Sequence, residues 1–430
     1  MNKKILKLSI PNIISNITVP LLGMADLAIA GRLGDFTYIG AIGIGAAIFN
    51  LIYWNFGFLR FGTSGFTAQA YGARDLGECG SSFIRGGVIA LGIALLILLA
   101  QYPLSRASLY ILNAEGETKS LALQYFSVRI WAAPATLMMY VCNGWFIGMQ
   151  NSKIPMTVAI TMNLINIGCS ALFALGFKMG IAGVALGTLI SQYSGVAMSM
   201  FFINRHYRKV FRLIKREAIF TASIMRRFFV VNSDIFLRTV CLAVVFTFFT
   251  SASSAMGEDI LAVNTLLIQL FTLFSYFMDG FAHAGEALVG RYTGAKNEQL
   301  LRKAISRLIL WGVYMSIPFT LLYAFGLEQV LSLFTDEKEV LSKSLEFRYW
   351  ITAVPIVSFL AFLYDGILVG ATQSAVMRNA MFVATSLFFV VYFALKPLFF
   401  ADALWIALLV YLLLRGVVQI LMFKVKKAIE

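Results

Sequence analysis

Five acidic residues lie inside stretches of the sequence that are otherwise almost entirely apolar: Asp26, Asp234, Asp279, Glu286 and Asp365. An ionisable side chain in a lipid environment is costly, so such a residue normally faces a cavity or an oppositely charged partner. A carboxylate that is removed from water can take up a proton near neutral pH. These positions therefore indicate proton or cation binding inside a membrane-embedded protein.

Asp26 is the strongest candidate among them. It lies late in the apolar segment 9–33 with no cation one helical turn before it, and Pro11 and Pro20 interrupt the same segment. Proline removes a backbone hydrogen bond and permits a kink. Because protonation would remove a charge and change how the segment packs, Asp26 has the chemistry of a proton-coupled switch. The alternative is a solvated aspartate that caps the turn at Gly31.

A second polar group occurs in the apolar segment 154–175. Asn163 and Asn166 are three residues apart and Ser170 is four further on, so a helix places them on one face. They could hydrogen-bond a carboxylate or coordinate a cation. Polar packing between membrane helices is the equally weighted alternative.

The second half of the chain carries a denser set of charges. Asp234 and Arg238 are four apart, which favours a structural ion pair on one helix face. Asp279, His283 and Glu286 fall at helical spacing on one face, where they could share protons with coupled titration or surround a water-filled vestibule.

Three further charged residues have less certain roles in the sequence. Asp365 stands alone in its apolar segment and could meet a cationic substrate. Arg60 and Arg129 are expected to pair with acids on neighbouring helices, which the sequence does not identify.

The elements that position these residues follow from composition. The chain has 430 residues, of which 60% are hydrophobic and 13% are charged, and its mean hydropathy is +0.81. These values argue against a soluble enzyme, a disordered chain and, despite the net charge of +14, a nucleic-acid binder. A helix needs about 20 apolar residues to cross a membrane. About twelve such segments are predicted, at 9–33, 38–70, 83–104, 119–149, 154–175, 179–203, 223–250, 259–291, 302–326, 340–370, 375–395 and 402–423.

Basic residues in the loops predict the orientation. The side of the membrane that holds both termini carries about 23 of the 35 Lys and Arg residues, so it is assigned to the cytoplasm. The amino terminus has no small-residue site that would close a cleavable signal peptide. We therefore expect a multi-pass protein of the inner membrane with both termini cytoplasmic, in contact with membrane lipids.

The sequence lacks the residue patterns of disulfide scaffolds, metal sites and several known catalytic motifs. The four cysteines are far apart and form no CxxC pair, and two histidines are too few for a histidine metal site, so no metal and no cofactor are expected. No P-loop, HExxH or GxSxG motif occurs. We expect a protein that is not an enzyme, has reduced thiols and acts as a monomer.

The two halves of the chain resemble each other at an offset of about 222 residues. Residues 143–152 read NGWFIGMQNS and residues 365–374 read DGILVGATQS, which share the pattern Asx-Gly-x3-Gly-x3-Ser. Six helices per half imply parallel repeats, a plan that many secondary transporters use. The prediction is an all-α membrane protein with an N-lobe at 1–204, a basic cytoplasmic linker at 205–222 and a C-lobe at 223–430.

Four long motifs together resemble the multidrug and toxic compound extrusion (MATE) family, in its DinF-like branch. They are PNIISNITVPLLGMAD at 11–26, LRFGTSGFTAQAYG at 59–72, NSDIFLR at 232–238 and DGFAHAGEA at 279–287. The resemblance covers essentially the whole chain. It implies twelve helices in two six-helix lobes around a V-shaped cavity, and antiport in which protons or sodium enter while amphipathic, often cationic, compounds leave.

The resemblance also implies roles for single residues. Asp26 matches the first-helix aspartate that binds the coupling proton, Asn166 matches a fifth-helix asparagine near it, and Thr188 matches a sixth-helix threonine. Asp365 lies where related branches place a cation-binding aspartate. Ser170 departs from the pattern, because many relatives have an aspartate there; coupling then rests on Asp26 alone, involves the C-lobe cluster, or is weak.

Two other functions remain open. A flippase for a lipid-linked precursor, from the same wider superfamily, predicts a basic cavity for phosphate groups, whereas the identified intramembrane acids favour cations. A channel or membrane scaffold would need neither a lone carboxylate on an interrupted helix nor a two-lobe duplication.

Overall fold

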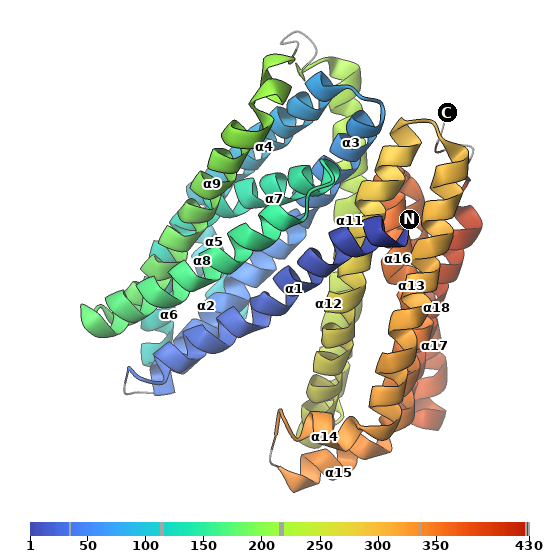
Figure 1. The fold of residues 1–430 in the computed structure, drawn as a ribbon. Coiled ribbons are helices and arrows are strands. Elements are labelled where there is room, and N and C mark those ends of the chain that lie inside the picture. Colours follow the sequence, from blue (N-terminus) through green and yellow to red (C-terminus); the bar gives the residue numbers. More distant parts are fainter. Residues whose placement is uncertain (34–35, 112–115, 215–218, 336, 426–427, 429–430) are drawn as a thin grey trace. The chain divides into compact units, whose positions relative to one another are not determined.

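The computed structural model describes residues 1–33, 36–111, 116–214, 219–335, 337–425 and 428. Every regular element in these ranges is a helix, and twelve helical spans are long and apolar enough to cross a membrane (Figure 1). The predicted all-α membrane architecture is confirmed. The chain divides into two compact units, which we name the first unit (Ile14–Arg226) and the second unit (Met1–Ile13 with Arg227–Glu430).

The helices have the following bounds. The first half of the chain contains α1 (Asn2–Ala30), α2 (Phe36–Trp54), η1 (Asn55–Gly57), α3 (Phe58–Gly72), α4 (Leu76–Leu99), α5 (Gln101–Ile111), α6 (Gly116–Arg129), η2 (Ile130–Ala132), α7 (Ala133–Gly148), α8 (Lys153–Ala171), η3 (Leu172–Gly176) and α9 (Gly180–Arg212). The second half contains α11 (Ala222–Ala255), α12 (Glu258–Gly294), α13 (Glu298–Phe325), α14 (Leu327–Leu331), α15 (Lys338–Glu346), α16 (Arg348–Gly370), α17 (Ser374–Phe399) and α18 (Asp402–Met422).

Three boundaries differ from the prediction. The segment 340–370 is two helices, α15 and α16, which meet at Phe347. The basic segment 205–222 begins as helix, because α9 continues to Arg212, and residues 215–218 of that segment lie outside the described residues. Residues Met1–Ile13 group with the second unit, so the division between the units falls inside α1.

The duplication is visible in the backbone of the helix ends. Helix α3 ends in a Schellman motif: the Asp75 N–H donates to the Ala70 carbonyl, and Arg74 has a φ of 61°. Helix α12 ends in the same way, with the Asn297 N–H donating to the Tyr292 carbonyl and a φ of 52° at Lys296.

The helices that follow also start alike. The Asp75 carboxylate accepts from the Glu78 N–H at 2.9 Å, and the Asn297 side chain accepts from the Leu300 N–H at 2.9 Å. Each side chain satisfies a backbone donor that the first turn of a helix leaves unpaired. The end of α3 and the start of α4 therefore recur, one repeat later in the sequence, as the end of α12 and the start of α13.

The glycines of the repeated motif bring helix pairs into close contact. A Cβ at Gly144 of α7 would lie 2.2 Å from the Arg60 carbonyl oxygen of α3. In the second half, a Cβ at Gly366 of α16 would lie 2.1 Å from the Ala282 carbonyl oxygen of α12. Only glycine permits this approach. The motif is therefore a packing motif that joins α3 to α7 and α12 to α16.

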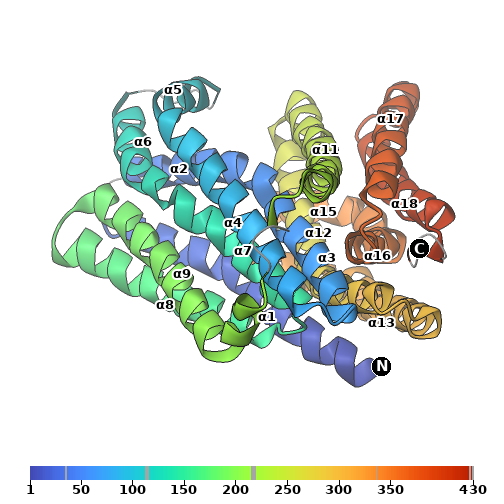
Figure 2. The same ribbon diagram turned by 90° about the horizontal axis from the view of Figure 1, so that it is seen from above.

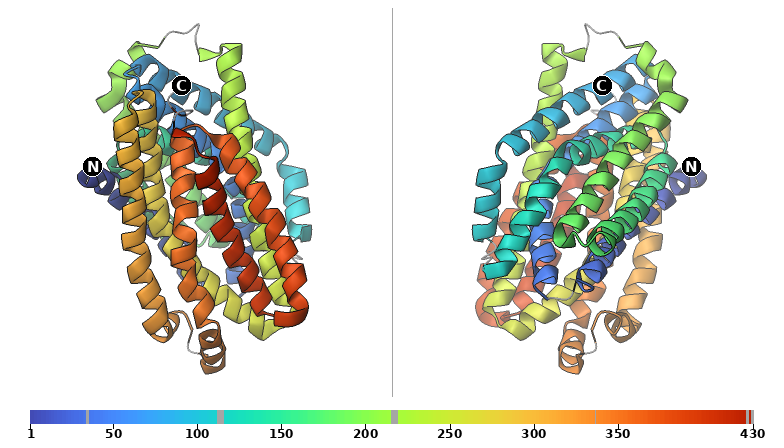
Figure 3. Two further views of the ribbon diagram at one scale, coloured as in Figure 1. Left: turned by 90° about the vertical axis from the view of Figure 1, so that its right-hand side faces the viewer. Right: turned by 90° about the vertical axis from the view of Figure 1, so that its left-hand side faces the viewer.

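Both units use the same packing plan. In the first unit α7 lies against α3, α4 and α9, and α8 runs beside α9 (Figure 2; Figure 3, right). In the second unit α16 takes the central place against α12, α13 and α18, and α17 runs beside α18 (Figure 3, left).

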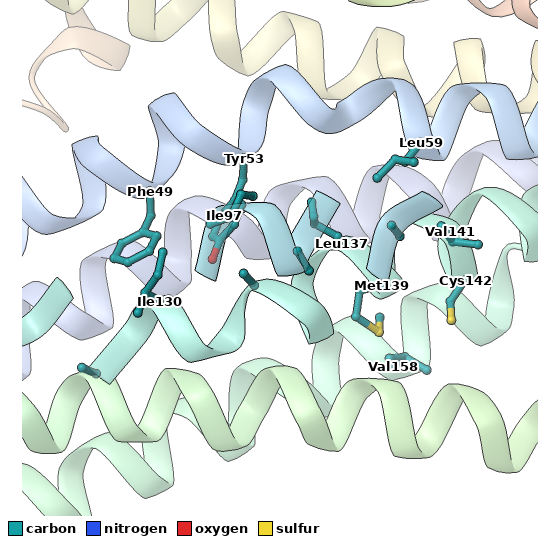
Figure 4. Packing of buried hydrophobic residues seen from close by; sticks show 14 of the residues in the cluster. Phe49, Tyr53, Leu59, Ile97, Ile130, Leu137, Met139, Val141, Cys142 and Val158 are labelled. Atoms are coloured by element: carbon teal, nitrogen blue, oxygen red, sulfur yellow. The ribbon is translucent and has the colours of Figure 1, made fainter. Parts of the chain in front are cut away.

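The core of the first unit is apolar and rich in aromatic side chains. Phe49 stacks on Phe126 at 5.3 Å and meets the Tyr125 ring edge-on at 6.4 Å, and Ile130 and Leu137 continue the same buried cluster (Figure 4). Many large apolar side chains instead lie exposed on the helices, such as Leu96 and Leu99 of α4. Such a surface suits contact with lipid chains.

Helix α15 lies outside the membrane spans and is tied to α12 by charge. Lys343 donates to the Asp259 carboxylate at 2.6 Å and to Glu339 at 3.2 Å. These hydrogen bonds, with that to Asp259 the stronger cause, raise the pKa of the Lys343 ammonium.

Candidate functional site

A polar cluster lies inside the first unit, where four helices contribute to it. We name it the first-unit cluster; it comprises Asp26 of α1, Tyr125 and Arg129 of α6, Asn166 and Ser170 of α8, and Thr188 of α9. Four of its six members, Asp26, Asn166, Ser170 and Thr188, are residues that the sequence singled out.

Hydrogen bonds join α8 to α9 within this cluster. The Asn166 amide donates to the Thr188 hydroxyl at 3.0 Å, and the Ser170 hydroxyl lies 3.3 Å from the Val184 carbonyl oxygen. Asn166 and Ser170 are buried, so both need such partners. Asn163, predicted on the same face, instead donates to the Thr18 carbonyl of α1 at 3.3 Å.

Gly187 sets the spacing of these two helices. A Cβ at this position would lie 2.6 Å from the Ser170 backbone nitrogen and 2.3 Å from its hydroxyl oxygen. Any larger residue would push α8 away from α9 and stretch the neighbouring bond from Asn166 to Thr188. Glycine therefore places the polar side chains within reach of one another.

Helix α6 adds a phenol and a guanidinium to the cluster. Arg129, in the last turn of α6, donates to the Tyr125 hydroxyl and lies over the Phe49 ring at 4.8 Å. A guanidinium on an aromatic face is favourable. The Tyr125 hydroxyl also interacts with the Thr188 hydroxyl, which links α6 to the bonds between α8 and α9.

Asp26 lies one turn before the end of α1, at the edge of this network. Its Oδ1 atom is buried and has no hydrogen-bond partner among the described residues. Arg129 acts on the carboxylate electrostatically but makes no ion pair with it within 4.0 Å. A buried acceptor without a donor is costly. A proton on this carboxylate would remove the charge and supply a donor, which is the chemistry predicted for Asp26.

The second unit contains a different kind of centre, built around Asp365 of α16. Its Oδ2 atom accepts from the guanidinium groups of Arg238 and Arg415, and its Oδ1 atom accepts from the Gln419 amide at 2.8 Å. Asp365 thus already has two cationic partners on other helices, and its contact with a cationic substrate stays a prediction. Two arginines already neutralise it, and an added cation would have to displace them.

The predicted pair of Asp234 with Arg238 is also replaced by other partners. Asp234 accepts from Arg378 at 2.6 Å and from the Ser374 hydroxyl at 2.7 Å, both on α17, while Arg238 bonds Asp365 on α16. Helical spacing permits an ion pair within α11. Bonds to partners on neighbouring helices are more favourable than a pair within α11, because they also bury the charges and satisfy more of the hydrogen-bonding groups of Asp234 and Arg238.

Of the three residues predicted on one face of α12, two contact each other in the structure. The Nδ1 atom of His283 lies 3.1 Å from the Glu286 carboxylate, and Glu286 is fully buried. Asp279 interacts electrostatically with Arg415 and so belongs to the surroundings of Asp365.

Five members of the two centres are absent from the predicted site: Tyr125, Arg378, Arg415 and Gln419, together with Arg129, whose partner was left open. Arg129 and Arg415 are basic residues inside apolar segments, a signal that calls for a buried partner. Tyr125 and Gln419 each lie four residues from such an arginine. The partner on a distant helix could not be read from the sequence.

In the described part of the chain, no three His, Cys, Asp or Glu side chains are grouped as a metal site requires. The four cysteines are free thiols, and Cys79, Cys142 and Cys241 are buried.

Comparison with known proteins gives consistent matches along most of the chain. The MatE family model matches twice, at residues 11–172 and 235–394, once in each half. The chain is 32% identical over 419 residues to DNA damage-inducible protein F of Escherichia coli (strain K12), which spans 96% of this chain and 90% of that protein. It is 24% identical over 396 residues to Multidrug export protein MepA of Staphylococcus aureus (strain MSSA476), which spans 89% of this chain and 85% of MepA.

Solved structures show the same fold. The Vibrio cholerae MATE transporter VcmN, in its bent form, superposes with a TM-score of 0.86 at 18% identity and covers 99% of this chain and 96% of that one. A MATE crystal structure in the bent conformation gives a TM-score of 0.87 at 19% identity, covering 98% and 94%.

Proposed function

Because the chain belongs to the MatE family of multi-pass membrane transporters, we propose that it is a secondary antiporter that exports amphipathic, cationic compounds in exchange for protons by alternating access. MepA, a multidrug export protein, is similar over most of its length, which supports export as the direction. The family's activity is transport rather than catalysis.

The observation that carries the proposal is the state of Asp26. Its carboxylate lies inside an apolar unit, has a buried oxygen without a hydrogen-bond partner among the described residues, and sits near the C-terminal end of α1. A negative charge at that end of a helix is unfavourable. Proton binding relieves this cost and proton release restores it, so occupancy by a proton changes the stability of the unit around α1.

A proton suits this site better than sodium does. Asp26 is the one carboxylate of the first-unit cluster, and the Arg129 guanidinium acts on it. That charge disfavours any cation, but a proton forms a covalent bond with one carboxylate oxygen, whereas a metal ion depends on electrostatic attraction to several oxygen ligands. The substrate is an amphipathic small molecule, and no resident cofactor takes part. We expect a monomer in the inner membrane with both termini in the cytoplasm.

The test uses purified protein in sealed liposomes with a fluorescent cationic dye. A pH gradient is expected to drive dye transport, and a sodium gradient at equal pH on both sides is not. Asp26→Asn removes the titratable group while keeping the size of the side chain, so the variant is expected to fold but to lose gradient-driven transport.

A matched control is Asp259→Asn, because Asp259 lies at the first turn of α12 and is exposed. It should transport like the wild type. Normal proton-driven transport by Asp26→Asn would overturn the role of Asp26. Dye transport driven by a sodium gradient alone would show that the coupling ion is sodium rather than the proton. Loss of dye transport together with movement of a labelled lipid-linked sugar would favour the flippase.

A further inference from the structure

We propose that Arg129 is a positioning residue for proton exchange at Asp26, and that its guanidinium alternates between the Tyr125 hydroxyl and the Asp26 carboxylate. The inference rests on the proposed function, because it assigns a device to the proton site that function requires. It adds a moving cation to a site that otherwise contains a single carboxylate.

The structure shows one of the two positions. The Arg129 guanidinium donates to the Tyr125 hydroxyl while lying over Phe49 at 4.8 Å and over the Tyr125 ring at 5.3 Å. In this position it leaves the Asp26 Oδ1 atom without a hydrogen-bond partner among the described residues. This is the arrangement expected when Asp26 carries a proton, because a neutral carboxylic acid does not attract the guanidinium strongly.

The second position follows from electrostatics. Arg129 already acts on Asp26 through space, and a charged carboxylate is a far stronger partner for a guanidinium than a phenol hydroxyl. When Asp26 releases its proton, the guanidinium is drawn from Tyr125 towards the carboxylate. The aromatic face of Phe49 can support the arginine stem in both positions, since stacking constrains the guanidinium less than a bidentate bond does.

Movement of Arg129 would affect the hydrogen bonds between α8 and α9. Tyr125 interacts with the Thr188 hydroxyl, and Thr188 accepts the Asn166 amide at 3.0 Å. Departure of the guanidinium removes one of the bonds that fix the Tyr125 hydroxyl. Proton release at α1 is thereby linked, through α6, to the polar bonds that hold α8 against α9.

Among the charged and titratable groups near Asp26, Arg129 is its main electrostatic partner. Tyr125 of α6 interacts electrostatically with both Arg129 and Asp26, and Tyr53 of α2 interacts with Arg129 and with the phenols Tyr140 of α7 and Tyr193 of α9. Helix α8 contributes the neutral Asn166 and Ser170. Ser170 is fully buried and bonded to the Val184 carbonyl, so no second carboxylate stands in the cluster to share the proton.

The experiment measures the pH at which dye transport is half-maximal in liposomes, with the pH difference across the membrane held constant. Arg129→Gln removes the cation that favours the charged carboxylate, so Asp26 should hold its proton to higher pH and the midpoint should rise by about one pH unit. Tyr125→Phe removes the alternative partner, which leaves the guanidinium with Asp26, so the midpoint should fall. Arg129→Lys keeps the charge and should restore a midpoint near that of the wild type.

Arg106 provides the matched control. It also lies over a tyrosine ring, that of Tyr102 at 5.0 Å, but it is exposed on α5. Arg106→Gln should leave the midpoint unchanged. Opposite shifts in Arg129→Gln and Tyr125→Phe support the alternation, because a purely structural role would lower the amount of folded protein without moving the midpoint.

Three results would overturn the inference while leaving the proposed function standing. The midpoint could stay at its wild-type value in both variants, which would remove Arg129 from proton exchange. Both variants could shift in the same direction, which would make Arg129 a fixed counter-charge. If Arg129→Gln does not fold, an unchanged midpoint in Tyr125→Phe overturns the alternation by itself. Absence of proton-driven transport in the wild type would instead refute the proposed function.

Discussion

At the scale of single residues, the two units treat their buried carboxylates in opposite ways. Asp26 has a buried oxygen without a donor and one cation acting on it at a distance. Asp365 receives two guanidinium groups and an amide. A carboxylate held by two cations is stabilised in its charged form and is a poor site for reversible proton binding. The proposed proton exchange therefore belongs to the first unit, and for the Asp365 centre we propose a structural role.

Removing the Asp365 carboxylate should destabilise the protein strongly. In Asp365→Ala the Arg415 guanidinium, which is 1% exposed, would be left buried without the carboxylate that it bonds. Such losses lower the free energy of unfolding by about 3–5 kcal/mol. Thermal melting in detergent would measure the loss, and adding Arg415→Met should recover part of it.

The control for this change is Glu298→Ala. It breaks an ion pair with Arg302 at 2.6 Å whose two side chains are about half exposed. Exposed pairs contribute about 0–1 kcal/mol, so melting should hardly change. Equal melting temperatures for Asp365→Ala and the wild type would contradict the structural role of Asp365.

At the scale of helices, the repeated glycines decide which pairs pack closely. Gly144 and Gly366 occupy equivalent places in α7 and α16, and each faces a carbonyl oxygen of the neighbouring helix. The same two helices end in matching Schellman motifs, with φ values of 62° at Gln150 and 51° at Thr372. The repeat therefore conserves both the contact and the turn that ends it.

Gly366→Ala should lower stability even though alanine favours helices. Its Cβ would meet the Ala282 carbonyl oxygen at 2.1 Å, and backbone cannot move aside as a side chain can. We expect a loss of about 1–3 kcal/mol, read as a lower melting temperature.

Gly92→Ala is the matched control, because nothing lies within 4 Å of the Cβ it would add. It should be neutral or stabilising by up to about 1 kcal/mol, as expected from helix propensity. If Gly366→Ala melted like Gly92→Ala, the close contact of α12 with α16 would be wrong.

At the scale of the whole molecule, charge and hydropathy decide how the chain lies in a membrane. Twelve spans with both termini on the more basic side predict that the start of α13 lies in the cytoplasm and that α15 lies outside the cell. A single cysteine at each place tests this orientation in a background where Cys169, the one native cysteine that is not buried, is alanine.

A membrane-impermeant maleimide added to whole cells should label Lys338→Cys but not Lys303→Cys. Both lysines are exposed, so access depends on the side of the membrane. Permeabilised cells should show labelling at both. Labelling of Lys303→Cys in intact cells would reverse the predicted orientation.

The sequence by itself determined the class, the number of spans and the duplication, and it singled out Asp26 as the candidate for proton binding. These features depend on local composition and on spacing along the chain, which the residues display directly. Apolar segments of about 20 residues have few stable alternatives to membrane helices. The motif at 143–152 and 365–374 was likewise visible as a repeat before its glycines were seen in contact.

Only the tertiary structure decided which charges meet. Asp234 and Arg238 have the spacing of a pair within one helix, yet each bonds a residue about 127–144 positions away. Arg129 could be recognised as needing a partner, but its electrostatic effect on Asp26 depends on how α1 and α6 lie. An ion pair depends on the distance between two helix faces, and helix-to-helix distances are set by packing across the unit rather than by neighbours in sequence.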